Sequence, residues 1–139
     1  MDCPFCNIHP EKNTILKKTK QVVVFLSNPS QMPGHLLIIP RRHIQKPSEL
    51  TSAERKELFD TLIHYQDKIL SKLAPGCDIS EHYRPFQKQN EYKVNHLHFH
   101  LKPRKLRDRL FQLSQKYEKK VFQYPTKTEE DRIFNILKE

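Results

Sequence analysis

The chain has 139 residues and a formal net charge of +9, a length that suits one ordinary domain and argues against two independent ones. It has no run of about eighteen apolar residues, so we expect no membrane-spanning helix, and its start, MDCPFC, lacks the basic and apolar regions of a signal peptide. Its three cysteines form no evident disulfide framework. We therefore expect a soluble, cytoplasmic protein in a reducing compartment.

The N-terminal part of the chain predicts a meander of antiparallel strands. Residues 14–19 and 21–27 form two β-rich runs, and the turn formers of 27–34 separate them from a third run, HLLIIP, at 35–40. A further short strand is expected near 77–83, before a polar loop. Strands that follow one another through short turns pair in antiparallel fashion.

Three helices are predicted. The first begins at Thr51, which forms a capping box with Glu54, and it carries apolar residues at helical spacing, namely Leu58, Leu62, Ile69 and Leu73. A long second helix covers 106–121, and Thr126 with Glu129 caps a short last one. The order of strands and helices predicts an α+β domain whose helices pack on one face of an antiparallel sheet.

Three histidines alternate with apolar residues in the segment VNHLHFHLKPR at 94–104. In an extended strand successive side chains point to opposite faces, so His96, His98 and His100 share one face while the apolar residues between them share the other. The same sequence could also form a half-buried strand that is merely rich in histidine, or a loose metal-binding tract. Three imidazoles in strict register favour a chemical site.

Most of the excess positive charge lies in one segment, which we call the basic stretch. It contains Lys102, Arg104, Lys105, Arg107, Arg109, Lys116, Lys119 and Lys120, against Asp108 and Glu118. A basic surface attracts phosphate-bearing ligands over long range, whether nucleotides or nucleic acid. The predicted partners are therefore a nucleotide substrate and, through a basic helix at 102–120, nucleic acid. The alternative is a solvated helix face that only keeps the protein soluble.

These segments resemble the landmarks of the histidine triad (HIT) superfamily of nucleotide hydrolases and transferases. The triad signature is similar to HLHFHL at 96–101, and the other two landmarks are similar to CPFCNI and MPGHLLIIPRRHI. The resemblance implies a HIT-like domain with an N-terminal zinc-binding segment at 1–104. We expect the C-terminal helices, at 105–139, to pack on the same domain. Because family members often pair, a homodimer is also expected.

The resemblance implies roles for the histidines. An imidazole with one nitrogen held by a hydrogen bond presents the other as a nucleophile near neutral pH. His98 would attack phosphorus and form a covalent nucleotidyl-histidine, while His100 donates a hydrogen bond to a non-bridging oxygen. His35 matches the fourth active-site histidine of the family, and His96 completes the catalytic set. Related transferases commonly have glutamine where this chain has His100, which favours hydrolysis.

The segment before the triad departs from the family. Relatives usually carry Gly-Gln-Ser or Gly-Gln-Thr there, whereas this chain has Glu91, Tyr92 and Lys93, and no glycine follows Gly76. The close backbone approach that glycine allows is therefore missing. Lys93 can supply a charge instead, and Gln89 is a nearby candidate for a hydrogen bond to the nucleotide.

The ribose site departs from the family too. Ser27 stands where relatives place Asp or Asn, with Asn28 beside it, and both are candidate nucleotide-binding residues. The same two residues could simply start a turn before Pro29. We predict a hydrolase of nucleoside 5′-phosphate derivatives, such as a phosphoramidate, a dinucleoside polyphosphate or an adenylylated acceptor. The alternative is a zinc-stabilised nucleotide or nucleic-acid binding module with little catalysis.

A structural zinc site is implied for the N-terminal segment. Cys3 and Cys6 have the C-x-x-C spacing at which two thiolates grip one tetrahedral ion, but such a site needs two more ligands. By resemblance these are His43 and His96, so that zinc would staple the irregular N-terminus to the sheet. The alternatives are a buried hook with two free thiols, His9 as a rival ligand, or a redox motif. A redox motif lacks a convincing helix behind it.

Overall fold

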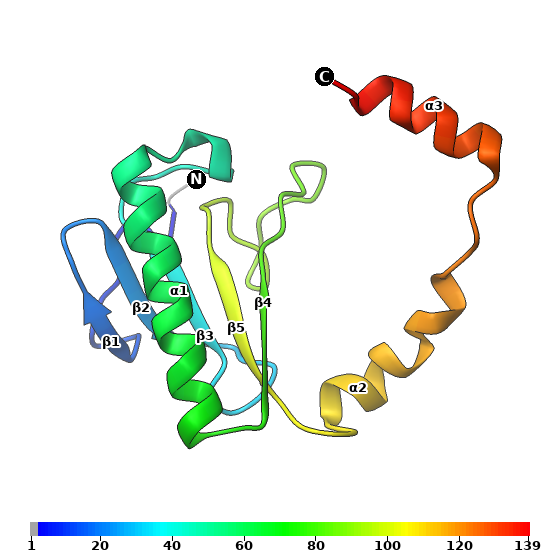
Figure 1. Cartoon of the computed structure of the whole chain (residues 1–139). Coiled ribbons are helices and arrows are strands. Elements are labelled where there is room, and N and C mark those ends of the chain that lie inside the picture. Colours follow the sequence, from blue (N-terminus) through cyan, green and yellow to red (C-terminus); the bar gives the residue numbers. More distant parts are fainter. Residues whose placement is uncertain (1–2) are drawn as a thin grey trace. The chain divides into compact units, whose positions relative to one another are not determined.

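Figure 1 shows the chain as a computed structural model, which describes residues 3–139. The chain divides into two compact units, Met1–Leu106 and Arg107–Glu139, which we call the sheet unit and the C-terminal unit. Within residues 3–139, no helix is both long and apolar enough to cross a membrane.

The sheet unit is built on a five-stranded antiparallel sheet with the order β1-β2-β3-β5-β4. Its strands are β1 (Ile15–Lys18), β2 (Val22–Leu26), β3 (Leu36–Pro40), β4 (Gly76–Ser80) and β5 (Phe99–Arg104). The predicted strands at 14–19, 21–27, 35–40 and 77–83 are therefore confirmed. β5 lies between β3 and β4, which places the end of the histidine segment inside the sheet.

Both faces of the sheet are covered. On one face lies α1 (Ser52–Lys72), as Figure 1 shows. It packs on a large core of Val22, Val24, Leu36, Ile38, Ile44, Leu50, Leu58, Leu62, Tyr65, Ile69, Ala74, Leu97 and Leu101. On the other face a smaller core consists of Ile8, Val23, Phe25, Leu37 and Ile39, against which Phe5 and Ile15 pack. The predicted α+β architecture, with a helix on one face, is confirmed.

The start of α1 is the predicted capping box. The Thr51 hydroxyl accepts a hydrogen bond from the Glu54 N–H, and the Glu54 carboxylate accepts one from the Thr51 N–H. A short 3₁₀ helix, η1 (Pro47–Glu49), precedes it. Of the predicted apolar positions, Leu73 is 58% exposed. It follows the last residue of the helix, where the chain turns towards β4.

The histidine segment is only partly a strand. The ladder of β5 begins at Phe99, so the predicted strand at 94–104 is wrong for its first five residues. The Leu97 N–H donates to the Ile44 carbonyl at 2.7 Å, and this bond ties the segment to the loop after β3. Alternation nevertheless survives, because Leu97 is buried in the large core, whereas the neighbouring His96, also buried, points its ring towards the Cys3 sulfur.

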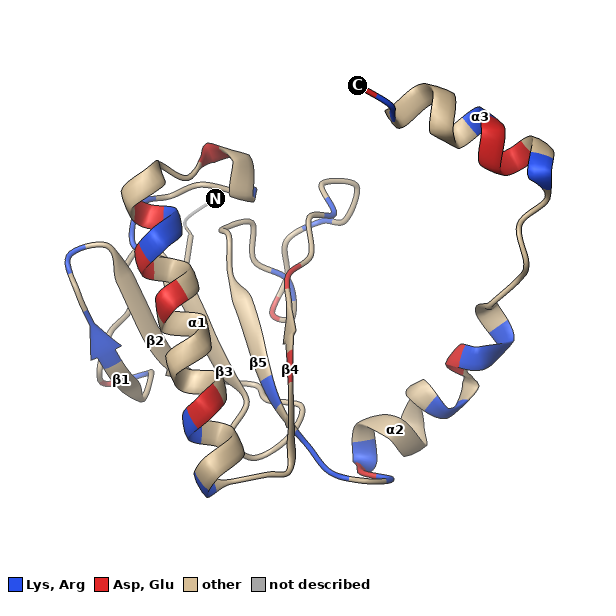
Figure 2. Cartoon of the chain, viewed as in Figure 1, with Lys and Arg blue, Asp and Glu red and all other residues tan. Residues whose placement is uncertain are grey.

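The C-terminal unit consists of α2 (Arg109–Leu113), the 3₁₀ helix η2 (Gln115–Val121) and α3 (Lys127–Leu137). The predicted single helix at 106–121 is wrong, because it breaks at Ser114, whose hydroxyl donates to the Leu110 carbonyl at 2.9 Å. The predicted cap of the last helix is confirmed, since the Thr126 side chain accepts from the Glu129 N–H. None of these three elements contains a buried residue. Lys and Arg gather along α2 and η2, and acidic residues along the start of α3 (Figure 2).

Candidate functional site

The middle histidine has a defined tautomer. The Nδ1 atom of His98 lies 2.7 Å from the carbonyl oxygen of His96. A carbonyl oxygen can only accept, so His98 Nδ1 carries the proton and donates it to this bond. The Nε2 atom of the neutral ring then has its lone pair available. This is the arrangement that a nucleophilic imidazole requires.

A chain of hydrogen bonds fixes the tautomers of His35 and His100. The Gln31 N–H donates to His35 Nδ1 at 3.1 Å, so the proton of the neutral His35 ring is on Nε2. His35 Nε2 lies 2.8 Å from His100 Nδ1 and donates to it. The proton of the His100 ring is therefore on Nε2, the nitrogen that remains to donate to a ligand.

Gly34 sets the position of His35. Its φ of +85° lies in the left-handed region that favours glycine. A Cβ atom at this position would lie 3.1 Å from side-chain atoms of both Leu73 and Pro103. The tight turn and close packing together bring His35 to the start of β3, within reach of His100 on β5.

Burial keeps the triad uncharged at neutral pH. Burial, followed by the charge of Lys102 and by His98, lowers the pKa of His35 to about 4. Burial and the surrounding His98, His35, Lys102 and His82 lower the pKa of His100 to about 3. Burial also lowers the pKa of His98. The pKa shifts therefore agree with the neutral rings that the hydrogen bonds require.

The imidazoles form a continuous row. The ring centroids of His98 and His100 are 4.9 Å apart, and those of His35 and His100 are 5.1 Å apart. Phe5, between the two N-terminal cysteines, packs edge-on against both His98 and His96, with ring centroids at 5.4 and 6.1 Å. The N-terminal segment thus touches the candidate nucleophile directly.

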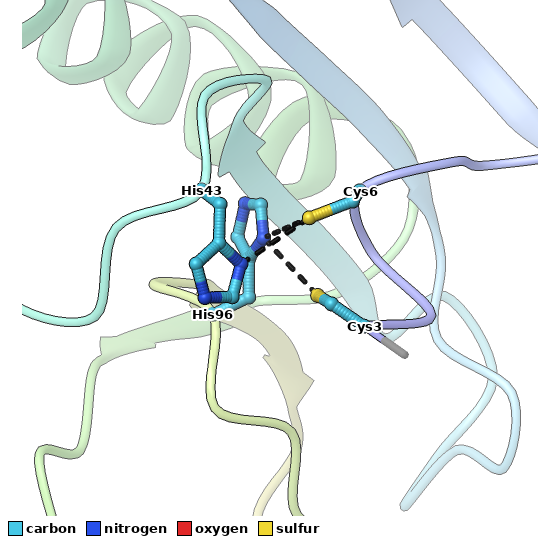
Figure 3. A group of neighbouring side chains, drawn as sticks. All are labelled: Cys3, Cys6, His43 and His96. Atoms are coloured by element: carbon cyan, nitrogen blue, oxygen red, sulfur yellow. Dashed lines mark hydrogen bonds between the residues drawn. The ribbon is translucent and has the colours of Figure 1, made fainter. Parts of the chain in front are cut away.

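Four predicted metal ligands come together at the other end of this row (Figure 3). The ligand atoms of Cys3, Cys6, His43 and His96 all lie within 4.8 Å of one another, so these residues could hold a metal ion. The Nδ1 atom of His96 is 3.4 Å from the Cys3 sulfur and 3.7 Å from the Cys6 sulfur, and His43 Nδ1 is 3.2 Å from the Cys6 sulfur. Sulfur and nitrogen ligands around one tetrahedral zinc ion lie about 3.5 Å apart. The donor set and its spacing fit zinc.

The tautomer of His96 suits this role. Its Nε2 atom lies 2.8 Å from the Pro40 carbonyl oxygen, to which it donates, so Nδ1 faces the thiols with a free lone pair. Burial and a hydrogen bond with the neighbouring Cys3 thiol raise the pKa of Cys6. A bound cation would favour the thiolate form instead. His9, the rival ligand, is not part of the cluster.

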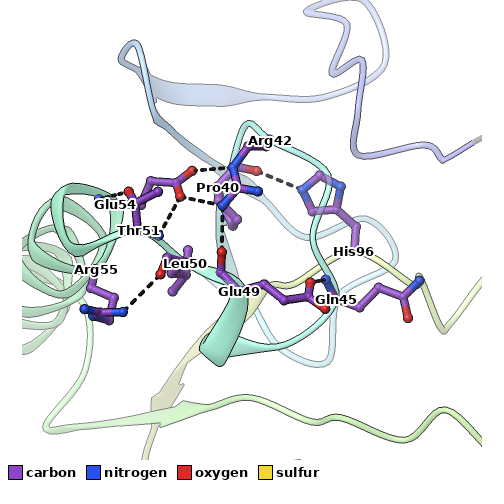
Figure 4. Close-up of polar contacts among 9 residues, drawn as sticks. All are labelled: Pro40, Arg42, Gln45, Glu49, Leu50, Thr51, Glu54, Arg55 and His96. Atoms are coloured by element: carbon purple, nitrogen blue, oxygen red, sulfur yellow. Dashed lines mark hydrogen bonds and ion pairs between the residues drawn. The ribbon is translucent and has the colours of Figure 1, made fainter.

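The loop that carries His43 is anchored to the start of α1 (Figure 4). The Arg42 guanidinium donates to both carboxylate oxygens of Glu54, at 2.8 and 3.2 Å, and to the Glu49 carbonyl at 2.7 Å. The Arg42 side chain and the hydrogen bond from Thr51 lower the pKa of Glu54 to about 2. Glu54 therefore stabilises both the helix cap and the loop that carries the candidate metal ligand His43.

The candidate nucleotide-binding residues are placed in turns and loops. The Ser27 hydroxyl donates to the Pro29 carbonyl at 2.8 Å, in the turn after β2, and Asn28 is exposed beside it. The Lys93 ammonium donates to the Gln87 carbonyl at 2.6 Å and to the Asn95 side chain at 2.9 Å. The Gln89 side chain accepts from the Asn95 N–H at 3.0 Å. Lys93 and Gln89 thus order the loop before the triad.

A small cleft opens beside His96, and its lining residues are Gln45, His82, Tyr83, Arg84, Pro85, Lys93, Val94, Asn95 and His96. Sequence reasoning missed His82, whose ring centroid lies 5.9 Å from that of His100. No local pattern connects it with the triad. It also missed Lys102 as a neighbour of His100, although the two-residue period of a strand places both on one face.

The sheet and the row of imidazoles define a histidine triad protein. Residues 10–107 match the family model described as HIT domain, and the chain belongs to the HIT family. It is 29% identical over 102 residues to the asymmetrical bis(5′-nucleosyl)-tetraphosphatase of Schizosaccharomyces pombe, covering 71% of this chain and 53% of that protein.

Two further comparisons extend this result. The chain is 26% identical over 134 residues to the nitrilase and fragile histidine triad fusion protein NitFhit of Drosophila melanogaster, covering 95% of this chain and 29% of that protein. The chain thus spans about half of the first relative and less than a third of the second. The crystal structure of a Zn-bound histidine triad family protein from Mycobacterium smegmatis has the same fold, with a TM-score of 0.65, 22% identity and coverage of 79% and 80%.

Proposed function

We propose that this protein hydrolyses a nucleoside 5′-phosphate derivative through a covalent nucleotidyl intermediate on His98. The observation that carries the proposal is the hydrogen bond between His98 Nδ1 and the His96 carbonyl, which leaves Nε2 as the nucleophilic atom. The similarity to a bis(5′-nucleosyl)-tetraphosphatase supports the same class of reaction.

The first step would form a bond between His98 Nε2 and phosphorus and break the bond to the leaving group. The His100 Nε2–H would then donate to a non-bridging oxygen as negative charge develops. His35 would hold His100 in the required tautomer through their 2.8 Å bond, as a positioning residue. Water would finally attack the phosphorus and free His98.

The test is a His98→Ala variant. It should lose turnover by a factor of at least about 10³, because no other imidazole can replace the nucleophile, yet still bind nucleotide. Mass spectrometry of the wild-type protein, quenched during turnover of a panel of phosphoramidates and dinucleoside polyphosphates, should find an adduct on the peptide with His98. Undiminished hydrolysis by the variant would refute the assignment.

We further propose that the metal is zinc with a structural role. Two thiolates and two imidazoles are ligands typical of closed zinc sites, and the solved relative from Mycobacterium smegmatis is Zn-bound. Protein prepared without chelator should contain about one zinc per chain. Cys6→Ser should lower the content, whereas His9→Asn should not, because His9 lies outside the ligand cluster.

An alternative function is nucleic-acid binding through the basic stretch. The ammonium groups of Lys116 and Lys120 lie 5.0 and 5.2 Å from the centroid of the Tyr117 ring, and Phe122 and Tyr124 are exposed further along the chain. Cations interleaved with aromatic rings suit single-stranded nucleic acid. Binding to a short oligonucleotide should then weaken steeply with salt, with a log–log slope that reports several displaced counterions, whereas mononucleotide binding should not.

We also propose a homodimer and a cytoplasmic location. Phe59, Ile63 and Leu70 recur at helical spacing on α1, and Leu73 follows the helix directly. Each of the four is at least 43% exposed, which is typical of a face that another surface covers. Light scattering in solution should give the mass of two chains, and the mass of one chain would contradict the proposed homodimer. The three cysteines are free, as expected in a reducing compartment.

A further inference from the structure

Lys102 is a partly buried cation next to the triad. It lies two residues after His100 on β5, so both side chains project from the same face of the sheet. Burial lowers the pKa of its ammonium. Its charge in turn helps to lower the pKa of three histidines, His35, His82 and His100. The ammonium therefore acts on the candidate active site.

This ammonium lacks a close anionic partner. The residue opposite it on β4 is Asp78, but the Asp78 carboxylate pairs with Arg104 at 2.7 Å. Within residues 3–139, no side chain forms a hydrogen bond or an ion pair within 4.0 Å with the Lys102 ammonium, although the Asp78 charge raises its pKa against the effect of burial. A charge that is partly removed from water without such a partner is unfavourable. An anion bound beside His100 would relieve this.

The surroundings indicate which anion fits. His98 and His100 would hold the phosphorus that is attacked, and Lys102 and the His82 ring flank His100. His100 and Lys102 on β5 and His82, two residues beyond the end of β4, are therefore three cationic or hydrogen-bonding groups close to the candidate nucleophile. A second phosphate, joined to the first through a bridging oxygen, would match this row better than an uncharged group.

We propose that Lys102 is a specificity-determining residue, whose ammonium binds the phosphate bonded to the one that His98 attacks. The inference rests on the proposed function. When His98 Nε2 bonds to phosphorus, the bridging P–O bond breaks and its electron pair stays on the departing phosphate. Lys102 neutralises that charge, which grows in the transition state. A leaving group that begins with phosphate is thus preferred over an amine or a phenol.

Two substrates with the same adenylyl group but different leaving groups distinguish this role from an effect of Lys102 on the reaction of any substrate. Diadenosine tetraphosphate has a polyphosphate leaving group, whereas the 4-nitrophenyl ester of AMP has none. In Lys102→Met, kcat/KM for the tetraphosphate should fall about tenfold or more, the effect of one charge-assisted hydrogen bond. The nitrophenyl ester should change less than about threefold. Lys102→Arg should retain most of the preference, and Lys72→Met, at the exposed end of α1, should retain all of it.

A binding measurement does not depend on turnover. The affinity of His98→Ala for inorganic tripolyphosphate, measured by calorimetry, should fall about tenfold when Lys102→Met is added, and should not fall when Lys72→Met is added. Equal losses on both substrates, or unchanged tripolyphosphate affinity, would overturn the role of Lys102. Failure of the proposed function would look different, because the wild type would then hydrolyse neither substrate.

Discussion

At the scale of single residues, the chemistry of the candidate site depends on which ring nitrogen of each histidine carries the proton. Two acceptors that cannot donate, the carbonyl groups of His96 and Pro40, fix the tautomers of His98 and His96. One donor that cannot accept, the Gln31 N–H, fixes His35 and through it His100. The backbone thus decides which nitrogen of His98 has a free lone pair, which nitrogen of His100 can donate, and which nitrogen of His96 faces the thiols.

The low pKa values of these rings predict how stability depends on pH. The unfolded chain takes up a proton on each histidine as the pH falls through about 6.5, whereas His35 in the folded protein stays neutral until about pH 4. The contribution that the neutral His35 ring makes to the free energy of unfolding should therefore be complete above pH 6.5 and should decrease as the pH falls towards 4. For His35 alone the loss is about 3 kcal/mol.

Urea unfolding between pH 7 and pH 4 measures this fall. His35→Asn removes the titrating group, so its stability should decline less than that of the wild type over the same range, at equal metal content. The two curves would run parallel if His35 were charged in the folded protein at pH 5, and the tautomer assignment would then be wrong.

At the scale of elements, the start of α1 links the fold with the metal-binding loop. Glu54 belongs to the helix cap, and its ion pair with Arg42 orders the loop in which His43 lies. His96 is joined to the same loop through Pro40. Removal of the Glu54 carboxylate should therefore affect both stability and metal retention.

We predict that Glu54→Ala lowers the free energy of unfolding by about 2 kcal/mol at pH 7, because it removes the returning bond of the capping box and leaves Arg42 without its carboxylate. The deficit should shrink as the pH falls from 4.5 towards 2, where Glu54 becomes protonated in the wild type. Metal release to a chelator should also become faster.

Asp60→Asn is a matched control for this variant. It removes another carboxylate of α1 whose ion pair with Lys56 is exposed, and it should change stability by less than about 0.5 kcal/mol. Equal effects of the two substitutions would show that the contacts of Glu54 with Thr51 and Arg42 add no particular stability.

Local patterns were sufficient for most elements of the sheet unit. The capping box and the strand runs led to the observed α1 and sheet, and the C-x-x-C indicated two of the candidate ligands. The other two, His43 and His96, were implied only by the resemblance to the HIT superfamily. Local patterns failed where distant contacts decide. Leu97 bonds to the loop after β3 instead of extending β5, and a side-chain bond of Ser114 divides the predicted helix. His82 reaches His100 only through the fold.

At the scale of the whole molecule, the two units differ in how they bury apolar residues. Both cores lie entirely within residues 8–101. The C-terminal unit exposes large apolar side chains, among them Leu113, Val121, Phe122, Tyr124, Phe134, Ile136 and Leu137. So short a segment cannot form a sufficient core alone. The sequence predicts that these helices pack on the sheet unit, and such packing would explain why the C-terminal unit carries so many large apolar residues.

A chain that ends at Leu106 tests this packing. It should fold and keep its metal, because cores and ligands all lie before that residue. If the C-terminal helices pack on the sheet unit, as the sequence predicts, the melting temperature of this shorter chain should be about 5 °C lower, equivalent to about 1 kcal/mol, because that packing would bury apolar side chains. In the full chain, Ile136→Ser should lower the melting temperature in the same direction, whereas Asn135→Ser should not. If the truncated chain melted at the same temperature as the full one, the helices would not pack on the sheet unit, and their apolar residues would need another partner.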